Sequence, residues 1–134
     1  MAAAESTSKR NEALLRRLFN EFGDPAMLAE VFAGDAEWHE PGSGPISGRY
    51  RGREAVVSLF QAVLGRSDGT FRVVEIDDVL VSDRHGCALV LVEAHNGERY
   101  IRTTDAIVFD FRDGQIVRGR VLSEDQTEVD AFWQ

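Results

Sequence analysis

Two carboxylic acids lie in surroundings that would change their affinity for a proton. Glu40 closes the stretch AEWHE (residues 36–40) directly before Pro41, and Asp105 interrupts the strand-like run TTDAIVF (residues 103–109). An apolar setting disfavours the charged form of a carboxyl group and raises its pKa, so that the group can take up and return a proton near neutral pH. Glu40 and Asp105 are therefore candidate catalytic residues for a proton transfer.

Each acid also has a plainer interpretation. Glu40 could lie on a rim and pair with an arginine of the following loop, at position 49, 51 or 53. Asp105 would be costly on an apolar strand face unless it is paired or protonated, and its alternative role is that of a cross-strand partner for an arginine. Strand alternation places Ala36, Trp38 and Glu40 on one face and His39 on the other. His39 is a third catalytic candidate, although this alternation points it towards solvent or an interface.

Other kinds of site find little support in the sequence. The three histidines, His39, His85 and His95, fall at unrelated ends of the expected fold, so we expect no metal site. The glycines of residues 42–48 do not have the spacing of a phosphate-binding loop. The only cysteine, Cys87, lies in the apolar run CALVLV and is expected to be a packed core thiol. We therefore expect neither a metal nor a cofactor.

Composition limits the partners and the compartment. The 134 residues fit one domain over residues 1–134, with a short flexible tail over about residues 1–8. A net charge of −8 argues against nucleic acid as a partner, and the arginines of residues 49–53 are expected to form a solvated loop face. No apolar stretch approaches the length of a membrane span and no signal peptide is evident, so we expect a cytoplasmic protein without membrane contact.

Hydrophobic periodicity predicts the elements that must position these residues. Helices are expected over residues 11–22, 25–33 and 53–64, and a short strand over residues 36–40. Four further strands are expected over residues 70–82, 86–95, 98–111 and 115–124, with type I′ turns at Asn96-Gly97 and Asp113-Gly114. The segment 125–133 is expected to dock through its aromatic residues. The fold class is α+β, with three helices from the N-terminal half on one curled, mainly antiparallel sheet.

This order of elements resembles that of the NTF2-like superfamily, and within it the SnoaL-like and ketosteroid-isomerase-like group. The similarity rests on FAGDAEWHEPGSGPISGRYRGREAV (residues 32–56), VFDFRDGQIV (residues 108–117) and DQTEVDAFW (residues 125–133), and it extends over roughly residues 10–133. The resemblance implies a cone-shaped fold whose sheet and helices enclose an apolar pocket. It also implies that Glu40, followed by Pro41, stands in the place of a catalytic carboxylate at the end of the first strand.

Several positions depart from the pattern of the enzymes in this group. Arg16 and Ile107 stand where the isomerases have an oxyanion-binding Tyr and Asp, although Asp105 shares the strand face of Ile107. Val121 stands where cyclases and epoxide hydrolases carry an acid on the last strand, and CALVLV lacks the Arg and Asp that the hydrolases need. Arg120 does match, and the resemblance implies that it could hold a carbonyl or anionic oxygen.

The resemblance implies a cofactor-independent isomerase, cyclase or dehydratase that acts on a small, largely apolar carbonyl compound of polyketide or steroid type. Glu40 would move the proton, and Asp105 or Arg120 would polarise the oxygen. One alternative is a non-catalytic protein that binds a hydrophobic metabolite; another is a dimeric assembly module with a vestigial pocket. A homodimer is expected under all three. The expected substrate-binding residues are Trp38, Phe19, Arg16, Phe60, Ile107, Phe109 and Arg120.

Overall fold

A computed structural model describes residues 6–134 of the chain, which form four helices and six strands. The helices are α1 (Thr7–Asn20), α2 (Pro25–Val31), α3 (Arg53–Arg66) and α4 (Gln126–Trp133). The strands are β1 (Phe32–Glu40), β2 (Gly48–Arg51), β3 (Arg72–Val81), β4 (His85–Asn96), β5 (Arg99–Arg112) and β6 (Gln115–Ser123). Residues 1–5 of the expected tail lie outside the described residues. The tail does not reach residue 8, because helix α1 begins at Thr7, where the Ser6 hydroxyl accepts a hydrogen bond from the Lys9 amide.

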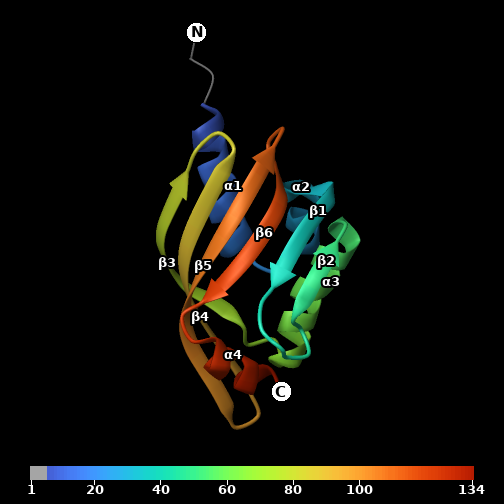
Figure 1. Cartoon of the computed structure of the whole chain (residues 1–134), viewed down its shortest axis with the longest axis vertical. Helices are drawn as coiled ribbons and strands as arrows, with labels where there is room; N and C mark the ends of the chain where they lie inside the picture. Colours follow the sequence, from blue (N-terminus) through green and yellow to red (C-terminus); the bar gives the residue numbers. More distant parts are fainter. Residues whose placement is uncertain (1–5) are drawn as a thin grey trace.

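All six strands form one sheet in the order β2-β1-β6-β5-β4-β3. Strands β3 to β6 form the antiparallel meander predicted from the sequence, whereas β1 joins the sheet beside β6 in a parallel pair. Helices α1, α2 and α3 cover one face of this curled sheet, and α4 lies across one end of it (Figure 1). The predicted α+β class with helices on a curled sheet is confirmed.

The region around β1 and β2 differs from the prediction. Helix α2 ends at Val31 and passes directly into β1 at Phe32, four residues before the predicted strand. Residues 48–51, expected in a loop, form the edge strand β2, which pairs antiparallel with β1. This strand has only four residues, of which the first, Gly48, has a positive φ, as does Gly52 directly after it, so the strand is too short to show a period of its own.

Two turns join the last three strands. Asp113 and Gly114 both have positive φ, at 51° and 77°, so the β5–β6 turn is the predicted type I′ turn. The β4–β5 turn was predicted one residue too early. Asn96 pairs with Arg99, so the turn residues are Gly97 and Glu98, and Gly97 alone has a positive φ, at 60°. This pattern is that of a type II′ turn, which takes glycine at its first central position.

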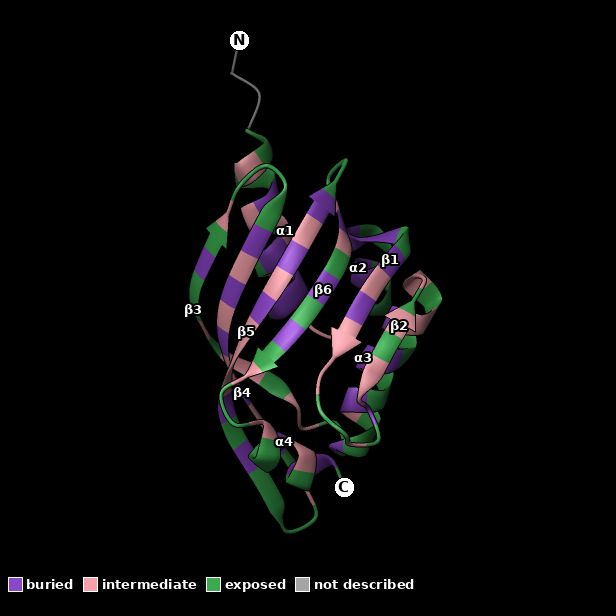
Figure 2. Cartoon of the chain, viewed as in Figure 1, coloured by how far each residue is buried: buried purple, intermediate pink, exposed green. Residues whose placement is uncertain are grey.

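The hydrophobic core lies between the helices and the concave face of the sheet. The predicted stripes of α1 and α3 are buried there, including Leu15, Leu18 and Phe19 from α1 and Val56, Leu59 and Phe60 from α3. Buried residues alternate with intermediate or exposed ones along much of the central strands (Figure 2), as expected for a sheet with one covered face. Across residues 6–134, none of the helices combines the length and hydropathy needed to cross a bilayer.

Candidate functional site

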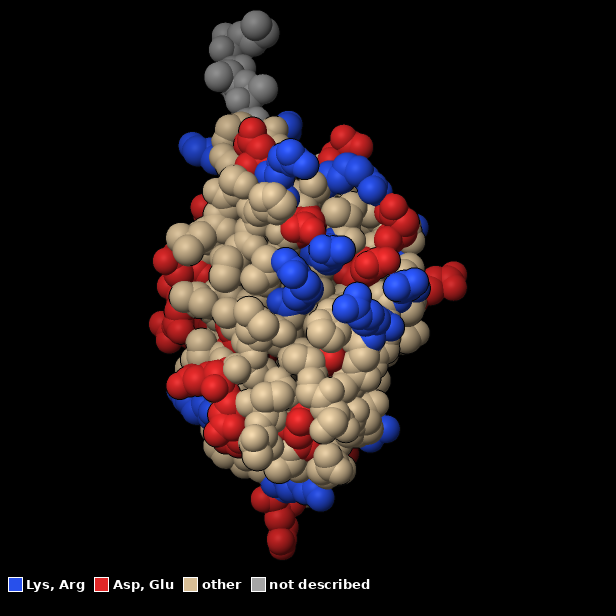
Figure 3. Space-filling view, viewed as in Figure 1, with Lys and Arg blue, Asp and Glu red and all other residues tan. Residues whose placement is uncertain are grey.

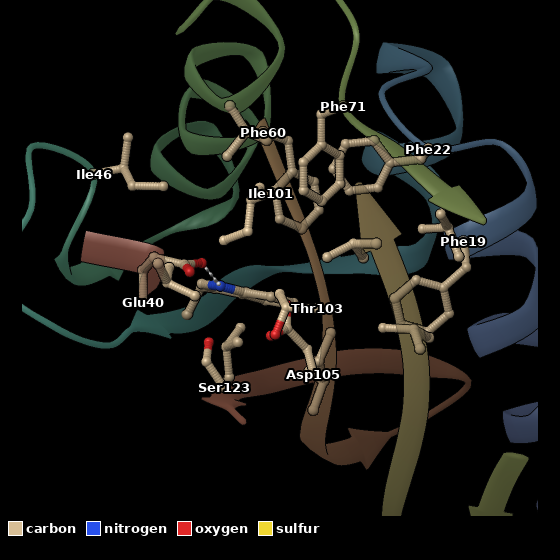
Figure 4. Close-up of a pocket in the computed structure, with 18 of the residues that line it drawn as sticks. Phe19, Phe22, Glu40, Ile46, Phe60, Phe71, Ile101, Thr103, Asp105 and Ser123 are labelled. Carbon is tan, nitrogen blue, oxygen red and sulfur yellow. Dashed lines mark hydrogen bonds between the residues drawn. The ribbon is translucent and has the colours of Figure 1, made fainter. Parts of the chain in front are cut away.

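An apolar cavity opens between the concave face of the sheet and helices α1 and α3, and α4 covers one end of it. The space between its walls, counted out to the open mouth, is about 730 Å³, and its interior is narrow. This narrow interior suits a small or flat occupant. The lining residues that Figure 4 labels are Phe19, Phe22, Glu40, Ile46, Phe60, Phe71, Ile101, Thr103, Asp105 and Ser123.

Glu40 is the last residue of β1, and its carboxylate faces this cavity. The Trp38 indole Nε1–H donates a hydrogen bond of 3.0 Å to Glu40 Oε1, drawn as a dashed line in Figure 4. Burial of the carboxylate, opposed by this hydrogen bond and reinforced by the charge of Asp105, raises the pKa of Glu40 to about 7. Among the described residues no arginine pairs with Glu40; Arg51 lies 3.8 Å from Glu37 instead. The rim-carboxylate interpretation is therefore wrong.

The Trp38 ring that holds Glu40 is itself fixed on several sides. Phe60 packs edge-on at a centroid distance of 5.0 Å, and Phe32 and Phe109 each lie 6.0 Å away. On β6, Gly119 pairs with Trp38, and the ring occupies the space where a side chain at position 119 would begin. This packing gives the indole one orientation and so fixes the direction from which Glu40 receives its hydrogen bond.

Asp105 lies on β5 and faces the same cavity. Its Oδ1 atom is buried and has no hydrogen-bond partner among the described residues. Burial raises the pKa of Asp105 to about 6, and the Ser123 hydroxyl acts in the opposite direction. Its cross-strand partners are Val90 and Ser123, so the alternative of a cross-strand arginine is wrong. An unpaired oxygen in an apolar cavity is available to hydrogen-bond a ligand.

Two neutral polar side chains in the cavity were not singled out from the sequence. Thr103 and Ser123 line the cavity beside the two acids (Figure 4). Thr103 lies two residues before Asp105, and Ser123 two residues after Val121, so strand alternation alone would have placed both on the cavity face.

The loop after Glu40 is held against helix α4. The Ser47 hydroxyl donates a hydrogen bond of 2.8 Å to the Pro41 carbonyl, and the Gln126 amide donates one of 3.4 Å to the same oxygen. The Ser43 amide hydrogen-bonds the Asp130 carboxylate at 3.3 Å. Ile46 from this loop, with Val129 and Trp133 from α4, closes the end of the cavity next to Glu40.

Three of the predicted site residues lie outside the cavity. Arg16 is exposed on α1 and pairs with Glu12 at 3.1 Å, because it is rotated away from the buried stripe. Arg120 is exposed on the convex face of the sheet, since its neighbours Gly119 and Val121 face inward. His39 also lies on the convex face, opposite Glu40, as its strand position indicated.

The remaining predicted site residues lie at or behind the cavity wall. Trp38, Phe19, Phe60 and Ile107 line the cavity. Phe109 is fully buried and supports the wall from behind, packed against Phe19 and Trp38. Within residues 6–134 no three His, Cys, Asp or Glu side chains are placed to hold a metal ion.

Comparison with known proteins assigns the chain to a family. Residues 12–119 match the sequence profile of the SnoaL-like domain. The chain belongs to the SnoaL-like domain family. The predicted resemblance is confirmed, and membership of this family supports either an isomerase- or cyclase-type activity or a binding role.

The SnoaL-like relatives in sequence are themselves uncharacterised. The protein Rv0034 of Mycobacterium tuberculosis and the protein Mb0035 of Mycobacterium bovis are each 30% identical over 122 residues, which cover 90% of this chain and 93% of theirs. Among solved structures, Bal32a from a soil-derived mobile gene cassette superposes with a TM-score of 0.92 at 32% identity, covering 96% of this chain and all of that one. An NTF2-like protein from Burkholderia xenovorans shares the fold, with a TM-score of 0.80 at 18% identity over 95% of this chain and 98% of that one.

Proposed function

We propose that this chain is a cofactor-independent enzyme that moves a proton on a small, largely apolar carbonyl compound, as an isomerase, cyclase or dehydratase does. The observation that supports this proposal is the pairing of Glu40 and Asp105 in one apolar cavity, where burial raises the pKa of both carboxyl groups to about 7 and about 6. A protein that only binds an apolar ligand gains nothing from two desolvated acids.

The two acids would act as a base and an acid in one step. The Glu40 carboxylate takes a proton from the carbon next to the substrate carbonyl, and the electron pair of that C–H bond passes into an enolate. Asp105 in its protonated form donates a hydrogen bond to the enolate oxygen. If the proton on Glu40 is first replaced by one from solvent, its return to the same carbon gives isotope exchange, whereas return to a different carbon gives an isomer.

This division of roles requires the two acids to share one proton. The pKa values of about 7 and about 6 lie close together, so the pair holds a single proton over that range and titrates as a unit. The Trp38 N–H donor stabilises the ionised form of Glu40. Glu40 has the higher pKa, so in the ligand-free chain the shared proton lies mainly on Glu40, and a substrate carbonyl oxygen placed at the unpartnered Asp105 Oδ1 would draw that proton to Asp105. With Arg120 on the convex face, Asp105 is the polarising group.

A non-catalytic binding protein is the second candidate. Ile107 and Val121 line the cavity at the two positions where family enzymes carry acids, so the wall offers fewer polar groups than theirs. The third hypothesis, an assembly module with a vestigial pocket, is disfavoured by the two desolvated acids that line the cavity.

We also propose that the chain works as a cytoplasmic homodimer. On the convex face, apolar side chains form a continuous patch over β3 to β6, in which Leu80 and Leu122 are both 58% exposed. The register places Leu80 beside Cys87, and it places Ala106 between Leu122 and Leu89. A patch of this kind favours association with a second copy. The single cysteine leaves no internal disulfide, which fits a reducing compartment.

The proposal is tested by solvent hydrogen exchange into small cyclic ketones in heavy water, followed by NMR. The wild-type chain should exchange the hydrogens next to the carbonyl, and Glu40→Gln should slow this exchange by about 10²- to 10⁴-fold. Glu37→Gln is the matched control, because Glu37 lies on the same strand but on the convex face. Binding of the ketones without exchange by the wild-type chain would favour the binding protein.

A further inference from the structure

Four arginines line a hollow on the convex face of the sheet, on the opposite side of β1 from the apolar cavity. The hollow is open and encloses about 560 Å³ counted out to its mouth. Figure 3 shows basic side chains gathered over β6, β1 and β2 on this face. The hollow is lined by Glu37, Trp38, His39, Arg49, Arg51, Arg118, Gly119 and Arg120.

Strand register brings these side chains together from three strands. On one rung of the sheet, His39 of β1 lies between Arg49 of β2 and Arg120 of β6. On the next rung, two residues along, Glu37 lies between Arg51 and Arg118. Residues two apart on a strand share a face, so all six side chains project from the convex side.

The two rungs differ in how their charges are balanced. In the second rung Arg51 lies 3.8 Å from Glu37, and Arg118 lies 3.7 Å from Asp110. In the first rung, Arg49 and Arg120 have no carboxylate within ion-pair distance among the described residues. The β5 neighbour of Arg120 is Val108, which offers no counter-charge.

This local excess of positive charge stands out in an acidic chain. The lining of the hollow holds four guanidinium groups and one carboxylate, whereas the whole chain carries a net charge of −8. The guanidinium groups of β2 and β6 repel one another across β1, and a bound anion reduces this repulsion. Guanidinium groups present paired N–H donors that match the oxygens of carboxylate and phosphate groups.

We propose that this hollow binds a small oxyanion of phosphate type, held between Arg49 and Arg120 with His39 as a hydrogen-bonding floor. The ligand is small because the acidic remainder of the chain repels an extended polyanion such as nucleic acid. The site does not depend on the chemistry proposed for the apolar cavity, although Trp38 contributes to the walls of both.

The test is titration of the full chain with inorganic phosphate at low ionic strength, followed by calorimetry and by NMR of the ¹⁵N-labelled protein. We expect saturable binding, with shifts confined to β1, β2 and β6. The double variant Arg49→Gln, Arg120→Gln should weaken binding about tenfold or more. All the altered arginines are exposed, so the fold is expected to persist, and circular dichroism checks that it does.

The control is the double variant Arg16→Gln, Arg72→Gln, which removes the same charge from α1 and β3. It should bind phosphate as the wild-type chain does, to within about twofold. Equal weakening in both double variants would show a general charge effect and overturn the proposal. Titration without saturation, or binding of a mixed-sequence oligonucleotide in preference to phosphate, would also overturn it.

Discussion

At the scale of single residues, the site depends on one hydrogen bond inside the cavity. Trp38 donates to Glu40, and this bond lowers the pKa of Glu40 against the larger effect of burial. The indole is held by three aromatic neighbours, so the donor stays in place whether or not a ligand is present. Trp38 therefore acts as a positioning residue for Glu40 and also as part of the cavity wall.

Replacing this donor gives the first prediction. Trp38→Phe removes the N–H group, so the pKa of Glu40 should rise above its value of about 7. Carbon-13 NMR of the labelled carboxyl groups measures this change directly. Trp133→Phe is the control, because Trp133 also lines the cavity but does not donate to Glu40. A Glu40 pKa that is unchanged in Trp38→Phe would contradict the role of the bond.

At the scale of secondary-structure elements, close packing between β1 and β6 limits which residues β6 can carry. Gly119 of β6 lies directly against the Trp38 ring, and a methyl group at this position would overlap it. Gly119→Ala should therefore destabilise the protein by about 1–3 kcal/mol through overpacking, and chemical denaturation measures this loss.

A glycine elsewhere provides the comparison for that variant. Gly65 lies in α3 and has open space around its Cα, so Gly65→Ala should leave stability unchanged or raise it by about 0.5–1 kcal/mol. If both alanine variants were equally stable, the close packing of β6 against Trp38 would not be a real constraint.

Local sequence pattern predicted most of these elements but not how they meet. The stripes of α1 and α3 and the β3–β6 meander follow from periodicity, because each element buries one face. The parallel pairing of β1 with β6 joins segments about eighty residues apart, and nothing local encodes it. The short strand β2 begins at one glycine and ends directly before another, and it shows no pattern.

The positions of the site residues were also only partly predictable from the sequence. Alternation along β1 correctly separated Glu40 from His39, since a strand with a covered face has a fixed inside and outside. Arg120 was assigned to the cavity by resemblance, and a shift of one residue along β6 is enough to move it to the opposite face. The closure of the cavity by Ile46 and α4 depends on loop contacts that no sequence period describes.

At the scale of the whole molecule, Glu40 and Asp105 should make the free energy of unfolding depend on pH. The folded chain holds protons on Glu40 and Asp105 more tightly than the unfolded chain does, so their contribution is greatest below about pH 4 and is lost as the pH rises towards 7. Asp35 and Glu93 act in the opposite sense, because ion pairs lower their pKa values, and they lose stabilisation in acid.

The variant Asp105→Asn tests how the raised pKa of Asp105 affects stability. A pKa raised from 3.8 to about 6 corresponds to a loss of up to about 3 kcal/mol above neutral pH. The variant should melt several degrees above the wild-type chain at about pH 8, and the difference should shrink towards about pH 5. Calorimetry at both pH values measures the two melting temperatures. A wild-type advantage at the higher pH would contradict the desolvation of Asp105.

The homodimer is also a prediction for the whole molecule. Leu122→Glu places a charge within the convex apolar patch and should shift the chain from dimer to monomer in sedimentation velocity. Thr127→Glu is the control, since Thr127 is exposed on α4 outside the patch. A wild-type chain that sediments as a monomer would contradict the proposal that the convex face is a dimer interface.

The most direct test of whether Glu40 and Asp105 form one proton-transfer site is the titration of Glu40 itself, by carbon-13 NMR of the carboxyl group in the ligand-free chain. We predict a pKa of about 7, and a lower value in Asp105→Asn, because the charge of Asp105 raises the pKa of Glu40. A pKa of Glu40 near its ordinary value of 4.5, with no change in Asp105→Asn, would contradict the claim that the two acids form one proton-transfer site.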